Sequence, residues 1–197
     1  SRGGRAMREL EVPEQIRGLI FDCDGTLVDS MPLHMRSWEQ AVVSLGGAWD
    51  PEFFTSKKGM PERHIVGLYN ERYGTDWDPE ATVRVKHGFF RAHADLFRPI
   101  PHVVRIAREY CGRLPMAVAS GGIREIVTLE LEAIRVADCF PVVLTADDAI
   151  RPKPAPDLFL EAARRLGVPP ESCQVFEDGD LGLEAARAAG MLATDVR

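Results

Sequence analysis

Residues 18–26 read GLIFDCDGT, and this short stretch says more about the fold than any other part of the chain. Its apolar run 19–21 is typical of a strand that is covered on both faces. Asp22 and Asp24 follow directly, and Gly25 supplies a turn. Because ligands bind at the carboxyl ends of strands in an open α/β sheet, we expect a metal site here. A surface turn rich in Asp and Gly is the alternative, and such turns often have no function.

Composition and charge limit the classes of function. The chain has 197 residues, of which 45% are hydrophobic and 27% are charged, as in ordinary globular proteins. This length allows one domain, or one domain that carries a smaller inserted domain. With 24 Lys plus Arg against 30 Asp plus Glu, the net charge is −6. That charge opposes binding to nucleic acid and to anionic membrane surfaces, so we expect neither as a partner.

Cysteine spacing and the chain ends suggest a location. Cys23, Cys111, Cys139 and Cys173 contain no CxxC pair, so they indicate neither a zinc site nor a disulfide framework, and we expect reduced thiols. No apolar stretch approaches the roughly 18 residues that a membrane span requires, and the N-terminus lacks the apolar core of a signal peptide. These features predict a cytoplasmic protein, with residues 1–15 as a disordered leader.

Strand and helix patterns alternate along most of the chain. After the first strand, buried strands are predicted at 116–119, 142–144, 174–176 and 192–194. Helices with apolar residues at three-and-four spacing are predicted at 101–111, 123–134, 156–166 and 181–189. This order predicts a Rossmann-like parallel sheet with helices on both faces, which is an α/β fold.

The segment 31–98 interrupts this alternation, because it contains helical patterns and no strand. The predicted helices are 33–45, 51–54, 61–73 and 79–96. A helical insertion at the ligand end of the first strand would stand over the site, so we interpret it as a cap domain. The core domain then comprises residues 16–30 and 99–197.

Three further groups of polar residues follow predicted core strands. Ser120 and Gly121 come between a strand and a helix, where a hydroxyl and free N–H groups suit a phosphate. A helix cap without a ligand is the alternative. Lys153 stands between prolines that stiffen the backbone beneath it, which suits an anion clamp, and a solvated basic loop is the alternative. Glu177 and Asp178 could complete a metal shell, or they could complement a helix N-terminus.

These four pieces, in this order, resemble the motifs of the haloacid dehalogenase superfamily of phosphohydrolases. The first motif is similar to residues 22–26, the second to Ser120, the third to Lys153 and the fourth to Glu177-Asp178 with the run that follows. The resemblance covers nearly the whole chain. It implies a core of this superfamily's fold with an α-helical cap of the first cap class, called C1.

Finer features resemble the subgroup of β-phosphoglucomutase and bacterial fructose-1-phosphate phosphatases. Residues 153–157 read KPAPD, and the Glu-Asp pair follows as in that subgroup. His34 matches a histidine of the subgroup and is expected to tie the cap to the core or to assist Asp24. Cys23 departs from the bulkier residue usual at its position. The resemblance implies a small phosphorylated sugar as the substrate.

The residues themselves suggest a mechanism. A phosphate monoester repels nucleophiles, so a divalent cation is needed to neutralise charge, and Mg²⁺ prefers oxygen ligands. We expect Asp22, the backbone carbonyl of Asp24 and Asp178 to bind Mg²⁺, with Glu177 as an additional candidate. Asp22 would attack phosphorus, and Asp24 would act as general acid and base. The phosphoryl oxygens would bind to the residues of the second and third motifs, namely Ser120, the Gly121 amide and Lys153.

Several alternatives stay open. A mutase needs a second anion clamp in the cap, and the resemblance places an arginine of the mutases at Glu62, one position before Arg63. We therefore favour hydrolysis over mutase activity. His34, Lys58 and Arg63 are the candidate cap contacts to substrate. A non-catalytic phosphate-binding protein is the alternative from another class, but it would be expected to have lost one of the catalytic residues. Nothing in the chain demands more than a monomer.

Overall fold

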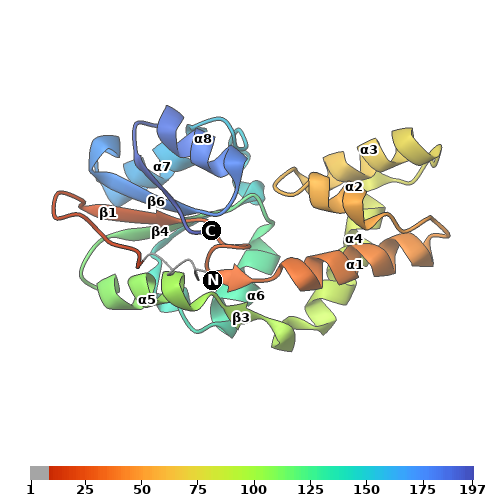
Figure 1. Cartoon of the computed structure of the whole chain (residues 1–197), viewed down its shortest axis with the longest axis horizontal. Helices are drawn as coiled ribbons and strands as arrows, with labels where there is room; N and C mark the ends of the chain where they lie inside the picture. Colours follow the sequence, from red (N-terminus) through yellow and green to blue (C-terminus); the bar gives the residue numbers. More distant parts are fainter. Residues whose placement is uncertain (1–8) are drawn as a thin grey trace, which may run out of the picture.

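The apolar run before Asp22 forms β1, Gly18–Phe21, and all 4 of its residues are buried. β1 is the central strand of a 5-stranded parallel sheet with the order β5-β4-β1-β6-β7 (Figure 1). The other strands of this sheet are β4 (Met116–Ala119), β5 (Val142–Leu144), β6 (Cys173–Glu177) and β7 (Leu192–Asp195). The computed structural model describes residues 9–197.

Helices cover both faces of the sheet, as the alternating sequence pattern predicts. Helices α5 (Pro101–Tyr110) and α6 (Arg124–Ala133) cover one face, and α7 (Asp157–Leu166) and α8 (Asp180–Ala188) cover the other (Figure 1). Successive side chains of a strand point to opposite faces. Leu19 and Phe21 therefore pack into the core under α5 and α6, whereas Ile20 packs into the core under α7 and α8. The predicted fold class is confirmed.

The segment after β1 forms a separate group of helices with its own apolar core. They are α1 (Met31–Ser44), α2 (Pro51–Ser56), α3 (Glu62–Tyr73) and α4 (Pro79–Ala92), followed by the 3-10 turn η1 (Ala94–Leu96). Asp50 and Asp78 cap α2 and α4, because their carboxylates accept the Phe53 and Ala81 N–H groups at 3.1 and 2.8 Å. Aromatic residues fill the core of this group, among them Trp38, Phe53, Phe54 and Tyr69.

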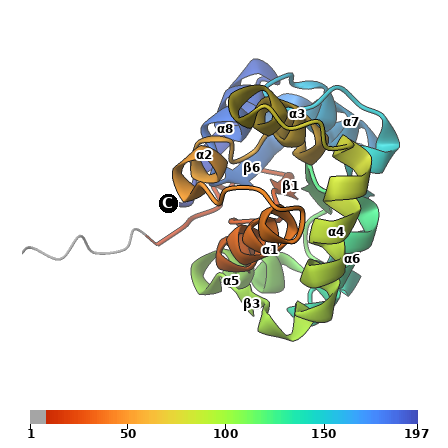
Figure 2. The same ribbon diagram turned by 90° about the vertical axis from the view of Figure 1, so that its right-hand side faces the viewer.

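These helices lie at the end of the sheet where β1 and β6 run out. Figure 2, which is turned so that the cap side faces the viewer, shows β1 and β6 behind and between α1, α2, α3 and α4. The segment is joined to the core by a short antiparallel pair, β2 (Val28–Asp29) and β3 (Arg98–Pro99). The sequence does not predict this pair, because two-residue strands are too short to show alternation.

Three further 3-10 turns lie in the connections of the core. They are η2 (Ala137–Cys139), η3 (Ala146–Asp148) and η4 (Pro170–Ser172). The core helices and strands begin and end close to their predicted bounds. The largest difference is in the cap, where the predicted helix 79–96 ends at Ala92 and His93 separates it from η1.

The predicted disordered leader, residues 1–15, is only partly described. Residues 1–8 lie outside the described residues. Leu10 packs into the apolar core, and the Glu11 carbonyl accepts a hydrogen bond from Gln174 Nε2 at 2.9 Å. For these residues the prediction of disorder is wrong, since a buried leucine and a specific backbone contact hold them against the sheet.

The prediction that all the cysteines are free thiols is also wrong. Cys111 and Cys139 form a disulfide across a sequence separation of 28, with their Cα atoms 5.1 Å apart. Cys23 and Cys173 are free and buried. Sequence spacing could not reveal the pair, because only the tertiary fold brings the end of α5 next to η2. Among residues 9–197, no helix has both the length and the apolar character that crossing a membrane requires.

We expect reduction of this disulfide to destabilise the protein. Reduction frees the chain between Cys111 and Cys139 in the unfolded state, which costs about 2–4 kcal/mol of unfolding free energy. Urea unfolding with and without dithiothreitol measures the difference. A double variant, Cys111→Ser with Cys139→Ser, is the control and should not respond to the reductant. Identical unfolding curves of the parent protein under both conditions would rule the disulfide out.

Candidate active site

Three acidic residues meet where β1 and β6 end. β1 and β6 are neighbours with Phe21 opposite Phe176, and the Asp22 N–H continues this pairing by donating to the Phe176 carbonyl at 3.0 Å. Asp22 therefore lies beside the end of β6, where Glu177 and Asp178 follow. All three acids are buried, and each offers a carboxylate oxygen within 4.8 Å of the others. We call Asp22, Glu177 and Asp178 the acid cluster.

Two lysines from distant parts of the chain compensate the acid cluster. Lys153 Nζ lies 3.0 Å from Asp22 Oδ1 and 3.4 Å from Glu177 Oε2, and it also donates to the Ala119 carbonyl at 3.0 Å. Burial disfavours the Lys153 ammonium, but Asp22 and Glu177 outweigh burial and raise its pKa above the usual value. Lys58, from the loop between α2 and α3, donates to Asp178 Oδ2 at 2.7 Å.

The acid cluster holds more negative charge than these lysines neutralise. Burial and the neighbouring Glu177 raise the pKa of Asp22 to about 7, in spite of Lys153. Burial and Asp22 raise the pKa of Asp178 to about 6, in spite of Lys58. Two carboxyls that resist ionisation side by side indicate a site that a cation would stabilise.

Small residues and one hydroxyl shape the cluster. The Thr26 hydroxyl lies 3.0 Å from Asp22 Oδ2 and 2.9 Å from Asp178 Oδ1. Gly25 has φ +82, and a Cβ atom there would lie 2.3 Å from Asp178 Oδ2. A Cβ atom on Gly182 would lie only 1.3 Å from Glu177 Oε2. Larger residues at these glycines would therefore displace the carboxylates.

Asp24 lies next to the cluster but makes different contacts. Its Oδ1 accepts the Ser30 hydroxyl at 2.6 Å and lies 2.8 Å from His34 Nε2. Burial opposes ionisation of Asp24, but His34 and Ser30 outweigh burial and hold the pKa of this carboxyl well below its usual range. The pKa values of the two aspartates of the first motif are thus shifted in opposite directions, because Asp24 ionises readily and Asp22 does not.

Another carboxyl, which the sequence pattern did not single out, lies beside Asp24. Glu130 on α6 is fully buried, and Cys23 Sγ lies 3.5 Å from its Oε2. Burial and the charge of Asp24 raise the pKa of Glu130 well above its usual value. The sequence does contain one signal for this residue. Glu130 stands at a position of the predicted helix where the spacing of apolar residues calls for a buried side chain, and buried Glu is rare without a partner.

The predicted phosphate-binding residues lie at the same edge of the sheet. Ser120 is buried directly after β4, and its Oγ accepts the Gly122 N–H at 3.0 Å. A Cβ atom on Gly122 would lie 3.3 Å from Ser120 Oγ and 3.6 Å from Asp24 Oδ2, so the loop approaches Asp24 closely. Gly121 is exposed, and a Cβ atom there would meet no atom of residues 9–197 within 4 Å.

Of the three cap residues predicted to contact substrate, two reach the acidic residues of the core and one does not. His34 on α1 reaches Asp24, and Lys58 reaches Asp178, so both bridge the cap and the core. Arg63 is exposed on α3, and it does not join either group. Its neighbour Glu62 instead pairs with Lys86 and His87 inside the cap, at 2.8 and 2.9 Å.

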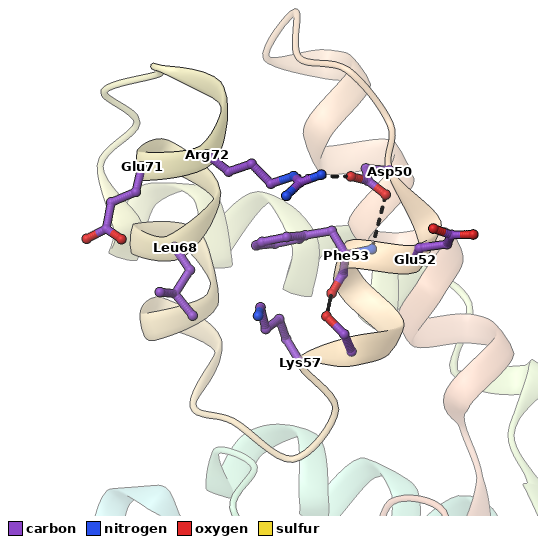
Figure 3. A pocket seen from close by; sticks show the side chains of 8 residues that line it. Asp50, Glu52, Phe53, Lys57, Leu68, Glu71 and Arg72 are labelled. Atoms are coloured by element: carbon purple, nitrogen blue, oxygen red, sulfur yellow. Dashed lines mark hydrogen bonds and ion pairs between the residues drawn. The ribbon is translucent and has the colours of Figure 1, made fainter.

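A groove on the cap lies between α2 and α3 and contains none of the residues of the acid cluster (Figure 3). Phe53 and Leu68 form its apolar part. Arg72 pairs with Asp50 across it at 3.7 Å, and the remaining lining residues are Glu52, Ser56, Lys57 and Glu71. The mixed charges of this groove do not match a phosphate.

The sequence is similar to those of known hydrolases. Residues 19–196 match the family model described as "Haloacid dehalogenase-like hydrolase". The chain is 40% identical over 185 residues to the fructose-1-phosphate phosphatase YqaB of Escherichia coli, covering 93% of this chain and 98% of that protein.

Solved structures of related proteins have a fold similar to that of this chain. The crystal structure of CbbY from Rhodobacter sphaeroides in complex with phosphate superposes with a TM-score of 0.82 at 26% identity, covering 90% of this chain and 84% of that one. A putative β-phosphoglucomutase from Thermotoga maritima superposes with a TM-score of 0.70 at 27% identity, covering 89% and 82% of the two chains. The predicted resemblance, including its subgroup, is confirmed.

We expect the metal-free protein to lose stability as the pH rises from 5 to 8. Asp22 and Asp178 have pKa values of about 7 and about 6 in the folded state, against 3.8 for an ordinary aspartate. Their stabilising contribution is complete below the unfolded pKa and is lost as the pH rises through the folded values. Thermal unfolding in EDTA at several pH values measures this loss, and added Mg²⁺ should reverse it at pH 8.

The control for this experiment is Asp178→Asn, which removes one of the two titrating groups. It should flatten the pH dependence of the metal-free protein and weaken the response to Mg²⁺. A melting temperature of the parent protein that rises from pH 5 to pH 8 in EDTA would contradict the assignment.

Proposed function

The chain belongs to the family of haloacid dehalogenase-like hydrolases, and from this premise we propose that it is a Mg²⁺-dependent phosphatase. Its substrate would be a small sugar phosphate, hydrolysed through an aspartyl phosphate on Asp22. The observation that carries the proposal is the contact of Asp22 with Lys153 inside a buried acid cluster. A phosphate dianion repels a carboxylate, so the nucleophile needs positive charge beside it.

The donor set fits Mg²⁺. Hard oxygen ligands and an excess of buried negative charge are the features that this ion prefers. The residues that would hold it are Asp22, Asp178 and the backbone carbonyl of Asp24, with Glu177 as an additional candidate. When bound, Mg²⁺ supplies the charge that neutralises the phosphoryl oxygens and orients them for attack.

Asp22 and Asp24 would divide the chemistry. An Asp22 carboxylate oxygen forms a bond to phosphorus while the ester bond breaks, and the leaving oxygen takes a proton from Asp24. A water molecule then attacks phosphorus and gives its proton to Asp24, which releases inorganic phosphate and restores Asp22. The contacts of Asp24 with His34 and Ser30 favour its ionised form, which is the base that this second step needs.

Three groups would hold the transferred phosphoryl oxygens. The Ser120 hydroxyl and the Gly121 N–H lie in the loop after β4, at the same edge of the sheet as Asp22. Lys153 already contacts Asp22, and the Ala119 carbonyl directs its ammonium. Donors fixed before the reaction stabilise the developing charge without reorganisation.

The cap supports hydrolysis over phosphoryl transfer to a second sugar phosphate. A mutase must also bind the far phosphate of a bisphosphate, which requires a free cation in the cap. Glu62 is acidic, and it pairs with the Lys86 ammonium, so neither of these two residues offers the free cation that a second phosphate requires. Lys58 is a cap cation that reaches the site, where it donates to Asp178 Oδ2, and we propose that it also contacts substrate.

Fructose 1-phosphate is the first substrate to test, because a relative that is 40% identical is a fructose-1-phosphate phosphatase. A panel with other sugar phosphates, phosphoglycolate and nucleotides should show Mg²⁺-dependent release of phosphate that is greatest for a sugar phosphate and is stopped by EDTA. Conversion of glucose 1-phosphate to glucose 6-phosphate, dependent on glucose 1,6-bisphosphate, would establish a mutase instead. Binding of phosphate without turnover of any compound would indicate a non-catalytic protein.

Replacing Asp22 by Asn should abolish turnover and leave the fold intact. The amide is isosteric with the carboxylate but is not a nucleophile, so we expect kcat to fall by at least about 10³-fold. Phosphate release from p-nitrophenyl phosphate and circular dichroism measure the two effects. Asp138→Asn, at an exposed position in η2, is the matched control and should keep the parent rate. Parent-level turnover by Asp22→Asn would contradict the mechanism.

A further inference from the structure

A buried lysine in the cap has no part in the mechanism above. Lys86 on α4 is 1% exposed. Its ammonium lies 2.8 Å from Glu62 Oε2 and 2.8 Å from His34 Nδ1, and it faces the Trp38 ring at 4.7 Å from the ring centroid. A buried charge of this kind is expensive to keep unless its partners are well placed.

Glu62 supplies the countercharge that Lys86 needs. It is the first residue of α3, and its two carboxylate oxygens also lie 2.9 and 3.0 Å from His87 Nε2. The three residues come from helices α3 and α4, and in this ion pair Lys86 is buried whereas Glu62 is partly exposed. Removing the carboxylate would leave the Lys86 ammonium buried and uncompensated.

The ammonium determines which nitrogen of His34 carries the proton. An ammonium has three N–H donors and no acceptor, so His34 Nδ1 must accept from Lys86 through its lone pair. The proton of the neutral ring is then on Nε2, which donates to Asp24 Oδ1 at 2.8 Å.

The Lys86 contact also excludes a metal role for His34. Asp24, His34 and Glu130 offer ligand atoms within 4.8 Å of one another, and together they resemble a second cation site. A metal would need the lone pair of His34 Nε2, with the ring proton moved to Nδ1. Lys86 blocks that arrangement, because its ammonium occupies the acceptor side of Nδ1.

We propose that Glu62 is a positioning residue for Asp24, acting through Lys86 and His34. Glu62 holds the Lys86 ammonium against His34 Nδ1, the ammonium keeps the proton on His34 Nε2, and that N–H orients the Asp24 carboxylate. This inference rests on the proposed function for its catalytic consequence, since Asp24 is the acid and base of that mechanism. It also gives a role to the acidic residue at the position where the resemblance places an arginine of the mutases.

The test is Glu62→Gln, which keeps the size of the side chain and removes its charge. Two-dimensional ¹⁵N–¹H spectra of the imidazole rings report which nitrogen is protonated, and His34→Asn identifies the His34 signals. We expect the parent protein to carry the His34 proton on Nε2 and Glu62→Gln to show a mixture of ring forms. We expect kcat to fall by about 10–100-fold with a smaller change in KM, as for other residues that orient a reacting group.

Matched variants separate positioning from general stability. Glu62→Asp keeps the charge and should restore most of kcat and the Nε2 form. Glu71→Gln, at an exposed position of the same helix, should change neither readout. If Glu62→Gln does not fold, Lys86→Met breaks the chain of contacts at the next position and should give the same mixture of ring forms.

Three results would overturn the inference: a parent protein with the His34 proton on Nδ1, unchanged His34 signals in Glu62→Gln, or a parent-level kcat in that variant. A parent protein that turns over no phosphate ester would overturn the proposed function instead. In that case the ring spectra still decide whether Glu62 fixes the form of His34.

Discussion

The compensation of buried negative charge is the constraint around which this molecule is built. Asp22, Glu177 and Asp178 lie within 4.8 Å of one another and are buried, and isolated carboxylates are not stable in such surroundings. Lys153 offsets part of this charge at Asp22, and Lys58 offsets part of it at Asp178. A divalent cation would neutralise the negative charge that remains. Metal binding and the stability of the site therefore depend on the same electrostatic interactions.

The parallel sheet makes this cluster unavoidable. β1 and β6 are neighbours in register, so the residues that follow Phe21 and Phe176 emerge side by side. β4 lies on the other side of β1 and brings Ser120 to the same edge. Gly25 and Gly182 leave the space that the carboxylates occupy. Strand order and the two glycines therefore convert four separate motifs into one site.

The cap adds a second set of buried charges, and it acts on Asp24 rather than on Asp22. Glu62, Lys86 and His34 form a line of contacts that ends at Asp24 Oδ1, where Ser30 also donates. His34 and Ser30 lower the pKa of Asp24, whereas burial and Glu177 raise the pKa of Asp22 to about 7. Two aspartates separated by one residue therefore have different electrostatic surroundings.

The sequence by itself determined the parallel α/β core, the helical insertion and the family, because strand and helix periods and the order of the motifs are local properties. It also identified Asp22, Asp24, Ser120, Lys153 and Asp178 as residues that share one edge of the sheet. Only the tertiary structure decided which distant segments of the chain contact one another. The Cys111–Cys139 disulfide, the packing of Leu10 and the Glu62–Lys86–His34 contacts all join segments that are distant in sequence. Such contacts depend on how helices pack in three dimensions, and a pattern that repeats every two or every 3.6 residues carries no information about them.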